Sequence, residues 1–205
     1  MAAAYWIRAK RALARGDPVL GRIIRSHPRI ALEPRGEAFH TLARAIVSQQ
    51  ISVKAAASIW ARVCALAPRM HPEEIAGTRH ARLRACGLSQ RKAEYLADLA
   101  GHFLDGKLHL HEWQRMDDEA VIAELVQVRG IGRWTAEMFL MFNLLRPDVL
   151  PLADLGLQRA IRVHYFKGRK VSLRSMRRVS QAWAPWRSVA TWYLWRSLDP
   201  IPVEY

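Results

Sequence analysis

Two glycines, Gly130 and Gly132, flank one aliphatic residue, Ile131, in the segment LVQVRGIGRWTAEMF at residues 125–139. Because neither glycine carries a Cβ atom, the backbone at this turn can approach another object closely. A helix that starts at once with Arg133 presents unpaired amide groups and the positive end of its dipole, which favour a phosphate. The segment therefore predicts a helix–hairpin–helix that grips a nucleic-acid backbone without reading its sequence, with Ile131 packed between the helices. Taken alone, such a turn fits a purely structural role equally well.

The charge of the chain supports a polyanionic partner. Its 205 residues carry 32 Lys and Arg against 18 Asp and Glu, a formal net charge of +14. An excess of this size points to nucleic acid ahead of an acidic membrane surface, because no strongly amphipathic surface helix stands out. The longest apolar stretches, near residues 138–142 and 150–157, are too short for a membrane span, so we expect none.

Composition narrows the class of protein further. The chain is long enough for about one to one and a half domains with a sizeable core. Two cysteines, Cys64 and Cys86, exclude a disulfide framework, a four-thiolate zinc site and a four-cysteine iron–sulfur cluster. A reducing compartment fits this cysteine content best.

Apolar residues recur at helical spacing almost everywhere. Ser89 and Asp117 are in position to cap two of the helices, and Pro185 is in position to open the last one at its first residue. No stretch of alternating β-branched residues competes with this pattern. The sequence therefore predicts an all-α protein of about eight to ten helices.

Together with the glycine turn, further segments carry a resemblance to a known family in the same order along nearly the whole chain. They are DPVL at residues 17–20, AIVSQQISVKAA at 45–56, RPDVLPLADLGLQRA at 146–160 and WAPWRSVATWYLWR at 183–196. The chain resembles the helix–hairpin–helix (HhH-GPD) DNA glycosylases, and within that superfamily it is similar to the 3-methyladenine DNA glycosylase II type.

This resemblance implies a bilobal, all-α fold with the active site in the cleft between two helical lobes. One lobe is a central bundle at residues 37–145, which includes the helix–hairpin–helix at 118–145. The other is built from both chain ends, residues 1–36 and 146–205. The implied activity is base excision repair: a monomer flips an alkylated purine, such as 3-methyladenine or 7-methylguanine, out of damaged double-stranded DNA and hydrolyses its glycosidic bond. If the chain is bacterial, we expect it in the cytoplasm, associated with the nucleoid.

Asp154 occupies the place of the superfamily's catalytic aspartate, about twenty residues after the hairpin. Leu155 begins the next helical run, so the helix dipole favours the ionised carboxylate. Such a carboxylate can stabilise a sugar that acquires oxocarbenium character and can orient or deprotonate the attacking water. The alternative is an ordinary N-cap, since Asp is among the commonest residues at that position, and the two roles do not exclude each other.

Trp134 bears on the reaction type. In relatives that also cleave the DNA strand, a lysine two residues after the second glycine forms a Schiff base with the sugar. Here that position is Trp134, and an indole cannot form an imine. The resemblance therefore implies a monofunctional enzyme with water as the nucleophile, an abasic site as the product and no lyase step.

The implied base pocket contains aromatic and apolar side chains, namely Trp134, Trp195, Met138, Leu155 and Trp192. An electron-rich ring attracts a cationic N-alkylated purine by roughly 0.5–2 kcal/mol. Two alternatives stay open: a preference for uncharged lesions such as hypoxanthine or ethenoadenine, and a non-catalytic DNA-binding module.

The resemblance also implies DNA and ion contacts. Gln50, with Gln49 beside it, takes the place of the wedge that fills the gap left by the flipped base, although a Gln-Gln pair at a helix end also fits a solvated turn. Phosphate contacts are expected from Gly130, Gly132, Thr135 and Arg133. A structural Na⁺ or K⁺ is expected on the backbone carbonyls of Val126, Val128 and Ile131. No cofactor for catalysis and no iron–sulfur cluster are expected.

Overall fold

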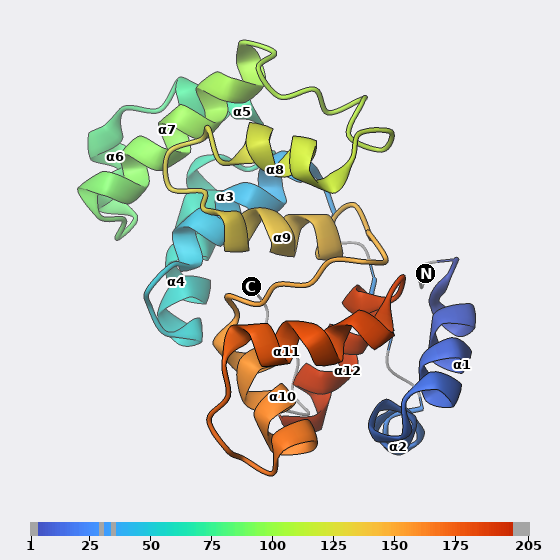
Figure 1. The fold of residues 1–205 in the computed structure, drawn as a ribbon. Helices are drawn as coiled ribbons and strands as arrows, with labels where there is room; N and C mark the ends of the chain where they lie inside the picture. Colours follow the sequence, from blue (N-terminus) through green and yellow to red (C-terminus); the bar gives the residue numbers. More distant parts are fainter. Residues whose placement is uncertain (1–3, 29–30, 34–35, 199–205) are drawn as a thin grey trace. The chain divides into compact units, whose positions relative to one another are not determined.

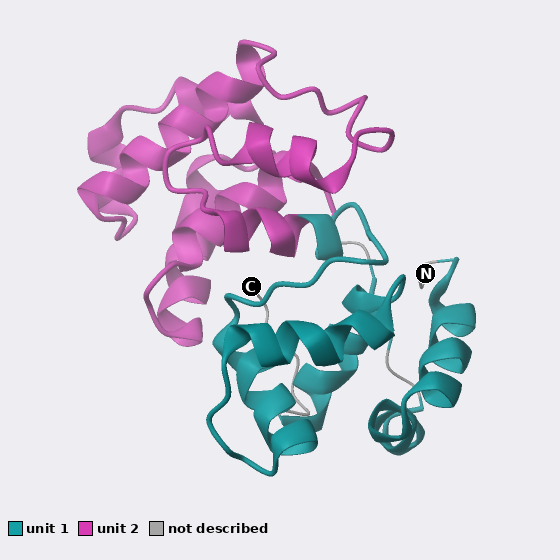
Figure 2. Cartoon of the chain, in the orientation of Figure 1, with its two compact units in different colours: residues 1–34, 140–203 teal, residues 35–139, 204–205 magenta. Residues whose placement is uncertain are grey.

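The computed structural model describes residues 4–28, 31–33 and 36–198. Every regular element among them is helical (Figure 1), which confirms the predicted all-α class. Two compact units divide the chain (Figure 2). Unit 1 contains the described residues up to 33 and those from 140 onward, and unit 2 contains residues 36–139. The predicted boundary between the two lobes, at residue 145, lies six residues after the observed boundary at residue 139. The difference arises because residues 140–142, the last turn of a helix that begins in unit 2, belong to unit 1.

The helices of unit 2 are α3 (Ala38–Ser48), α4 (Val53–Leu66), α5 (Pro72–Ala76), α6 (His80–Ala85), α7 (Gln90–Leu104), α8 (Asp118–Leu125) and most of α9 (Arg133–Phe142). Those of unit 1 are α1 (Trp6–Gly16), α2 (Pro18–Ser26), α10 (Leu155–Phe166), α11 (Leu173–Ser180), the 3₁₀ helix η1 (Gln181–Trp183) and α12 (Arg187–Leu198). Twelve α-helices in the described ranges exceed the eight to ten expected, since α5 and α6, with five and six residues, are too short to show a period.

Helix α7 is the centre of unit 2, where it packs against α3, α5 and α6. Ser89 caps it as predicted, accepting a hydrogen bond from the Lys92 amide at 3.3 Å. The buried face of α7 comprises Ala93, Leu96, Leu99 and Ala100. Beyond it, Phe103 meets Phe39 of α3 edge to face, with ring centroids 5.1 Å apart. This aromatic contact joins the helices that support the hairpin.

Helix α12 is the centre of unit 1, where it packs against α1, α2 and α10. All nine residues from Ser188 to Arg196 are buried, so the helix is enclosed on every side. The prediction that Pro185 occupies its first position was wrong, because the helix begins at Arg187. Trp6 of α1 stacks on Tyr193 at a centroid distance of 5.9 Å and fixes the N-terminal helix on this core. No helix in the described part of the chain is both long and apolar enough to cross a bilayer.

Candidate active site

The hairpin connects α8 and α9 through residues 126–132. Asp117 caps α8 as predicted, accepting from the Ala120 amide at 2.8 Å. Two backbone hydrogen bonds shape the turn: the Val128 amide donates to the Leu125 carbonyl at 3.2 Å, and the Ile131 amide donates to the Val128 carbonyl at 3.0 Å. Ile131 is 4% exposed, as its predicted packing between the two helices requires. Helix α9 begins at Arg133, where the sequence placed it.

The two glycines of the turn are required for different reasons. Gly130 has φ +87°, and a Cβ atom built on it would lie 2.2 Å from Cδ2 of Tyr95 in α7. The group that packs closely against Gly130 is therefore the Tyr95 ring of the same chain, and not a ligand. The φ of Gly132 is not in the left-handed region, and a Cβ atom there would meet nothing within 4 Å. Only Gly132 leaves open space through which a ligand from outside can reach the backbone.

The segment after α3 is tied to the hairpin. Gln49 donates from Nε2 to the Gly130 carbonyl at 2.8 Å, and Lys92 donates from Nζ to the Val47 and Gln49 carbonyls at 2.8 and 2.6 Å. Burial lowers the pKa of Lys92. Gln50 is exposed and has φ +56°. Of the two glutamines proposed to contact DNA, Gln49 is thus engaged inside unit 2, and Gln50 projects from a turn that Gln49 holds in place.

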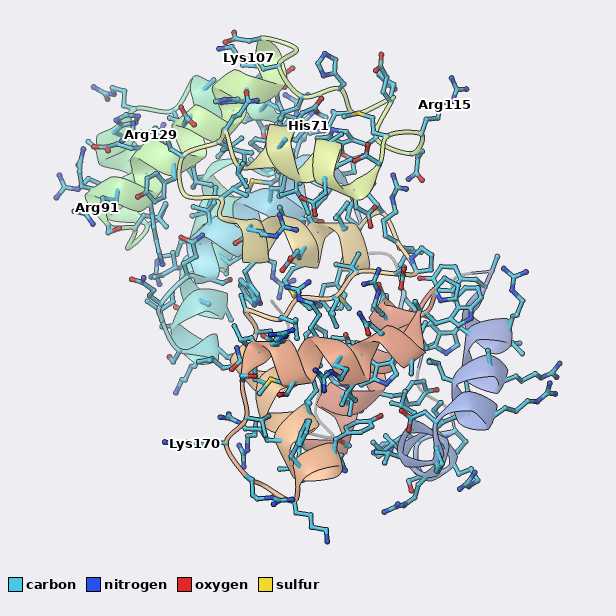
Figure 3. The ribbon with its side chains drawn as sticks, in the orientation of Figure 1. His71, Arg91, Lys107, Arg115, Arg129 and Lys170 are labelled. Atoms are coloured by element: carbon cyan, nitrogen blue, oxygen red, sulfur yellow. The ribbon has the colours of Figure 1, made fainter. Side chains whose placement is uncertain are left out.

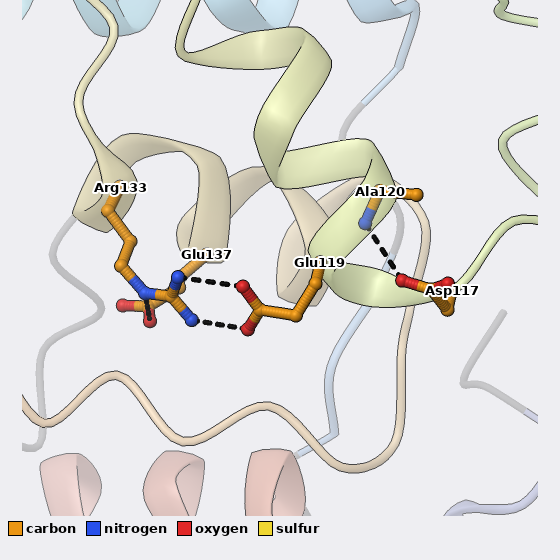
Figure 4. A network of polar contacts seen from close by, with 5 residues as sticks. All are labelled: Asp117, Glu119, Ala120, Arg133 and Glu137. Carbon is orange, nitrogen blue, oxygen red and sulfur yellow. Dashed lines mark hydrogen bonds and ion pairs between the residues drawn. The ribbon is translucent and has the colours of Figure 1, made fainter.

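Arg133 contributes to an ion-pair network within unit 2 (Figure 4). Its guanidinium donates to both carboxylate oxygens of Glu119, at 2.8 and 2.5 Å, and from Nε to Glu137 at 3.1 Å. The hydrogen bonds to Glu119 raise the pKa of Arg133 and lower that of Glu119. A guanidinium that already binds two carboxylates is a poor additional phosphate ligand, so the structure gives Arg133 the role of joining α8 to α9. Thr135 is buried, with 8% of its surface exposed.

Asp154 is the N-cap of α10, which confirms the alternative interpretation of this residue. Its Oδ1 accepts hydrogen bonds from the Leu157 amide at 2.6 Å and from Nε1 of Trp195 in α12 at 2.8 Å. The residue is 7% exposed, but its neighbours Ala153, Leu155 and Gly156 are exposed, so it lies directly beneath the surface. The capping role fixes the carboxylate in one orientation and leaves its proposed catalytic role possible.

Gly156 also belongs to this arrangement, although nothing in the sequence singled it out. A Cβ atom at Gly156 would lie 3.1 Å from Asp154 Oδ1 and 3.4 Å from Cδ1 of Trp195. A side chain at this position would therefore crowd the carboxylate and the indole that donates to it. A glycine two residues after a capping aspartate, as in Asp154-Leu155-Gly156, is the only local pattern that marks this position.

Trp195 belongs to an aromatic cluster in unit 1. Its ring stacks on Phe142 at 6.1 Å, and Trp192 meets both Phe142, at 5.7 Å, and Trp195, at 6.4 Å, edge to face. The Arg196 guanidinium lies 4.5 Å from the Trp192 ring. Within the described chain, Nε1 of Trp192 is buried without a hydrogen-bond acceptor. Two of the predicted pocket residues, Trp192 and Trp195, are thus brought together, and Trp195 also contacts the Asp154 carboxylate.

The other predicted pocket residues are placed differently. Trp134 and Met138 lie one turn apart on α9 in unit 2, the first half-buried and the second 6% exposed. Leu155 is 74% exposed. Because it lies two residues before Leu157, it points away from the face of α10 that packs in the core. Leu155 is therefore an exposed neighbour of Asp154.

A second buried carboxylate, Asp17, organises the polar interior of unit 1. Its Oδ1 caps α2 by accepting from the amides of Val19 and Leu20 at 2.8 and 3.1 Å. Its Oδ2 accepts from the Tyr165 hydroxyl at 2.7 Å and from Trp183 Nε1 at 3.1 Å. The Asp-Pro pair at the start of a helical run predicts the capping role, but no pattern in the sequence predicts the hydrogen bonds from Tyr165 and Trp183.

The described residues contain no group of three or more His, Cys, Asp and Glu side chains that could hold a metal ion. Both cysteines are free thiols; Cys86 is buried and Cys64 is half-buried.

Comparison with known proteins gives consistent matches. The model of the HhH-GPD superfamily of base excision DNA repair proteins matches residues 43–185. A relative from Bacillus subtilis, named as the putative DNA-3-methyladenine glycosylase YfjP, is 43% identical over 128 residues. The match covers 62% of this chain and 45% of that protein, so the chain spans less than half the length of this relative.

Two solved structures are similar over most of the chain. The crystal structure of a DNA-3-methyladenine glycosidase from Bacillus halodurans has a TM-score of 0.84 and 36% identity, covering 92% of this chain and 87% of that one. The 3-methyladenine DNA glycosylase Mag1 of Schizosaccharomyces pombe, in complex with abasic DNA, has a TM-score of 0.77 and 32% identity, covering 96% of this chain and 100% of that one.

Proposed function

The chain belongs to the HhH-GPD superfamily of base excision DNA repair proteins, and we propose that it is a DNA glycosylase that hydrolyses the glycosidic bond of alkylated purines in duplex DNA. The observation that carries this proposal is the Asp154 carboxylate, held at the start of α10 by the Trp195 indole and placed directly beneath the surface. The products are the free base and an abasic site.

The proposed mechanism uses the charge of Asp154. As the bond between base and deoxyribose breaks, the sugar acquires positive charge that a fixed carboxylate stabilises. At about 4 Å and an effective dielectric constant of about 20, one pair of unit charges is worth about 4 kcal/mol, or roughly a thousandfold in rate. Water then attacks the anomeric carbon and its proton passes to the carboxylate or to solvent. The Leu157 amide and the Trp195 indole contribute by holding the carboxylate in place before the reaction.

Alkylated purines are the substrates that the aromatic cluster favours. A 3-methyladenine or 7-methylguanine base in DNA is cationic and its glycosidic bond is weakened, so little protonation of the leaving group is needed. An indole face attracts such a cation by roughly 0.5–2 kcal/mol. We assign this role to Trp195, because the Arg196 guanidinium already lies over the Trp192 ring. The test is base release from duplexes that each carry one lesion. We expect the cationic lesions to be released faster than hypoxanthine or ethenoadenine, and the reverse order would assign the chain to uncharged lesions.

The proposal includes hydrolysis without strand cleavage, since Trp134 stands where a Schiff-base lysine would be needed. Borohydride added during turnover is therefore expected to trap no covalent complex with DNA. DNA binding without release of any lesion in the panel would instead identify a non-catalytic binding module.

Recognition of the DNA backbone is assigned to the amides from Gly132 to Thr135 at the start of α9. The carbonyls of Val126, Val128 and Ile131 are neutral oxygen ligands, a donor set that suits Na⁺ or K⁺ better than a divalent ion. A cation held there would stabilise the turn. Replacing K⁺ and Na⁺ with tetramethylammonium at constant ionic strength is expected to weaken duplex binding. We assign the wedge that replaces the flipped base to Gln50, and Gln50→Ala should then slow base release.

A further inference from the structure

The positive charge of the chain is concentrated in one unit. Of the formal net charge of +14, unit 1 carries +13 and unit 2 carries +1. Residues 117–139, which contain the hairpin, include five acidic residues and two arginines. Residues 155–198 of unit 1 contain ten Lys and Arg and no Asp or Glu. The excess that predicted a polyanionic partner therefore lies largely outside the motif proposed to bind DNA.

Seven of these cations are exposed on α10, on α11 and on the loop between them, and we call them the α10–α11 basic surface. They are Arg159, Lys167, Arg169, Lys170, Arg174, Arg177 and Arg178. Within the described ranges none of the seven forms an ion pair. In Figure 3, the Lys170 side chain extends from the loop away from the ribbon.

The loop that presents these charges has a defined backbone. Lys167 and Gly168 both have positive φ, at +50° and +78°. The Gly168 amide donates to the Arg162 carbonyl at 2.9 Å, and the Arg169 amide donates to the Phe166 carbonyl at 3.0 Å. These hydrogen bonds close the end of α10 and hold the following basic residues in a fixed turn.

Helix stability explains the arginines of α11 only in part, because the dipole favours Arg177 and Arg178 in the last turn. Arg174, Arg177 and Arg178 are three and four residues apart, so they lie on one face, opposite the buried Met176. Like charges at this spacing repel each other, and Arg174 lies in the first turn, where the helix dipole disfavours a cation. A bound polyanion would offset both effects. Helix α11 is thus a basic amphipathic helix, which corrects the expectation that none stands out; the net charge of the whole chain does not reveal it, because that sum carries no information on position.

In unit 2, by contrast, several basic side chains form ion pairs with acidic side chains of the same unit. Lys107 pairs with Asp105 at 2.7 Å, Arg129 with Glu94 at 3.3 Å, and Arg69 with Glu74 at 3.2 Å. Arg133 likewise binds Glu119 and Glu137. Unit 2 thus pairs these four cations with its own carboxylates, whereas the α10–α11 basic surface has no acidic partner among the described residues.

We infer that the α10–α11 basic surface is a second DNA-binding surface, which contacts phosphates of duplex DNA independently of sequence and of the lesion. The choice of DNA as the polyanion rests on the proposed function. Arginine donates two parallel hydrogen bonds to phosphate oxygens, and about six such contacts make binding strongly dependent on salt. An anionic membrane fits less well, because the apolar face of α11 around Met176, 1% exposed, is already packed in the core.

The test is a triple variant, Lys170→Gln, Arg174→Gln and Arg178→Gln, titrated with an undamaged duplex at several salt concentrations. The slope of log Kd against log salt should decrease by about 0.9 for every phosphate that the variant no longer neutralises. The slope is therefore expected to fall by about 2–3 and the affinity by about tenfold or more. Because the duplex is undamaged, this result does not depend on whether the wild-type protein releases alkylated bases.

The matched control removes three exposed arginines from another surface of unit 1 through Arg11→Gln, Arg15→Gln and Arg25→Gln. Figure 1 places α1 and α2 across unit 1 from the α10–α11 loop. Circular dichroism establishes that both variants fold. The inference predicts a clearly smaller decrease in affinity for the control. It is overturned if both variants lose affinity equally, if the α10–α11 variant binds like wild type, or if that variant loses affinity for anionic vesicles but not for DNA.

Discussion

Gly130→Ala should destabilise unit 2 far more than Gly132→Ala, although the two glycines are separated by one residue. At Gly130, a left-handed backbone costs a residue with a Cβ about 1–2 kcal/mol. The Cβ would also lie 2.2 Å from the Tyr95 ring, and relieving such overpacking costs about 1–3 kcal/mol. The expected decrease is therefore about 2–5 kcal/mol in the free energy of unfolding. Gly132→Ala meets no atom within 4 Å, so its only expected cost is that of a poorer residue just before the helix, at most about 1 kcal/mol.

Urea denaturation followed by circular dichroism measures both variants, and binding of an undamaged duplex provides the second readout. Gly132→Ala should unfold like the wild-type protein but bind duplex more weakly, because its new methyl group occupies the open space at the turn. Gly130→Ala in a Tyr95→Ala background should cost only the backbone part, about 1–2 kcal/mol. Equal stability of the two alanine variants, or no relief from removing the Tyr95 ring, would refute the assignment of Gly130 to internal packing.

Three further predictions concern the buried carboxylates and one exposed pair. Trp195→Phe keeps an aromatic side chain but removes the indole N–H that donates to Asp154, so kcat should fall by about tenfold to 150-fold, equivalent to about 1.5–3 kcal/mol. An unchanged kcat in steady-state kinetics would argue against this role. Asp17→Ala removes a helix cap and the acceptor for two donors, Tyr165 and Trp183. Urea denaturation should therefore show a decrease of about 3–5 kcal/mol in the free energy of unfolding, and Tyr165→Phe should show a smaller decrease. The hydrogen bond to Glu124 raises the pKa of His109 above 6.5, so the stability it adds is complete below pH 6.5 and is lost as the pH rises through the raised pKa. The difference in unfolding free energy between wild type and His109→Ala should accordingly shrink as the pH rises above 6.5, and a constant difference would exclude the charged pair.

Local signals in the sequence were sufficient for the helix boundaries that support the site. Ser89, Asp117 and Asp154 each cap the helix that follows, because a side-chain oxygen reaches an amide only two or three residues away. The start of α9 at Arg133 follows from the glycine turn in the same way. These interactions depend on neighbours along the chain, so residue type and spacing determine them.

Contacts between distant residues could not be predicted in this way. Gly130 packs on Tyr95, 35 positions earlier, and Arg133 pairs with Glu119 from the preceding helix. Neither contact follows from spacing, which by itself predicts ligand approach at the first glycine and phosphate binding by the arginine. The exposure of Leu155 depends on which face of α10 packs in unit 1, which the short apolar run around it does not determine.

The central claim, that Asp154 provides the charge for glycosidic hydrolysis, is tested most directly by Asp154→Asn. Asparagine keeps an oxygen for the Leu157 amide and the Trp195 indole, so the variant should fold and bind duplex DNA like the wild-type protein. Release of 3-methyladenine under single-turnover conditions should fall by at least about a hundredfold. If the variant releases the base at nearly the wild-type rate, Asp154 is only a helix cap and the proposed hydrolytic mechanism is wrong.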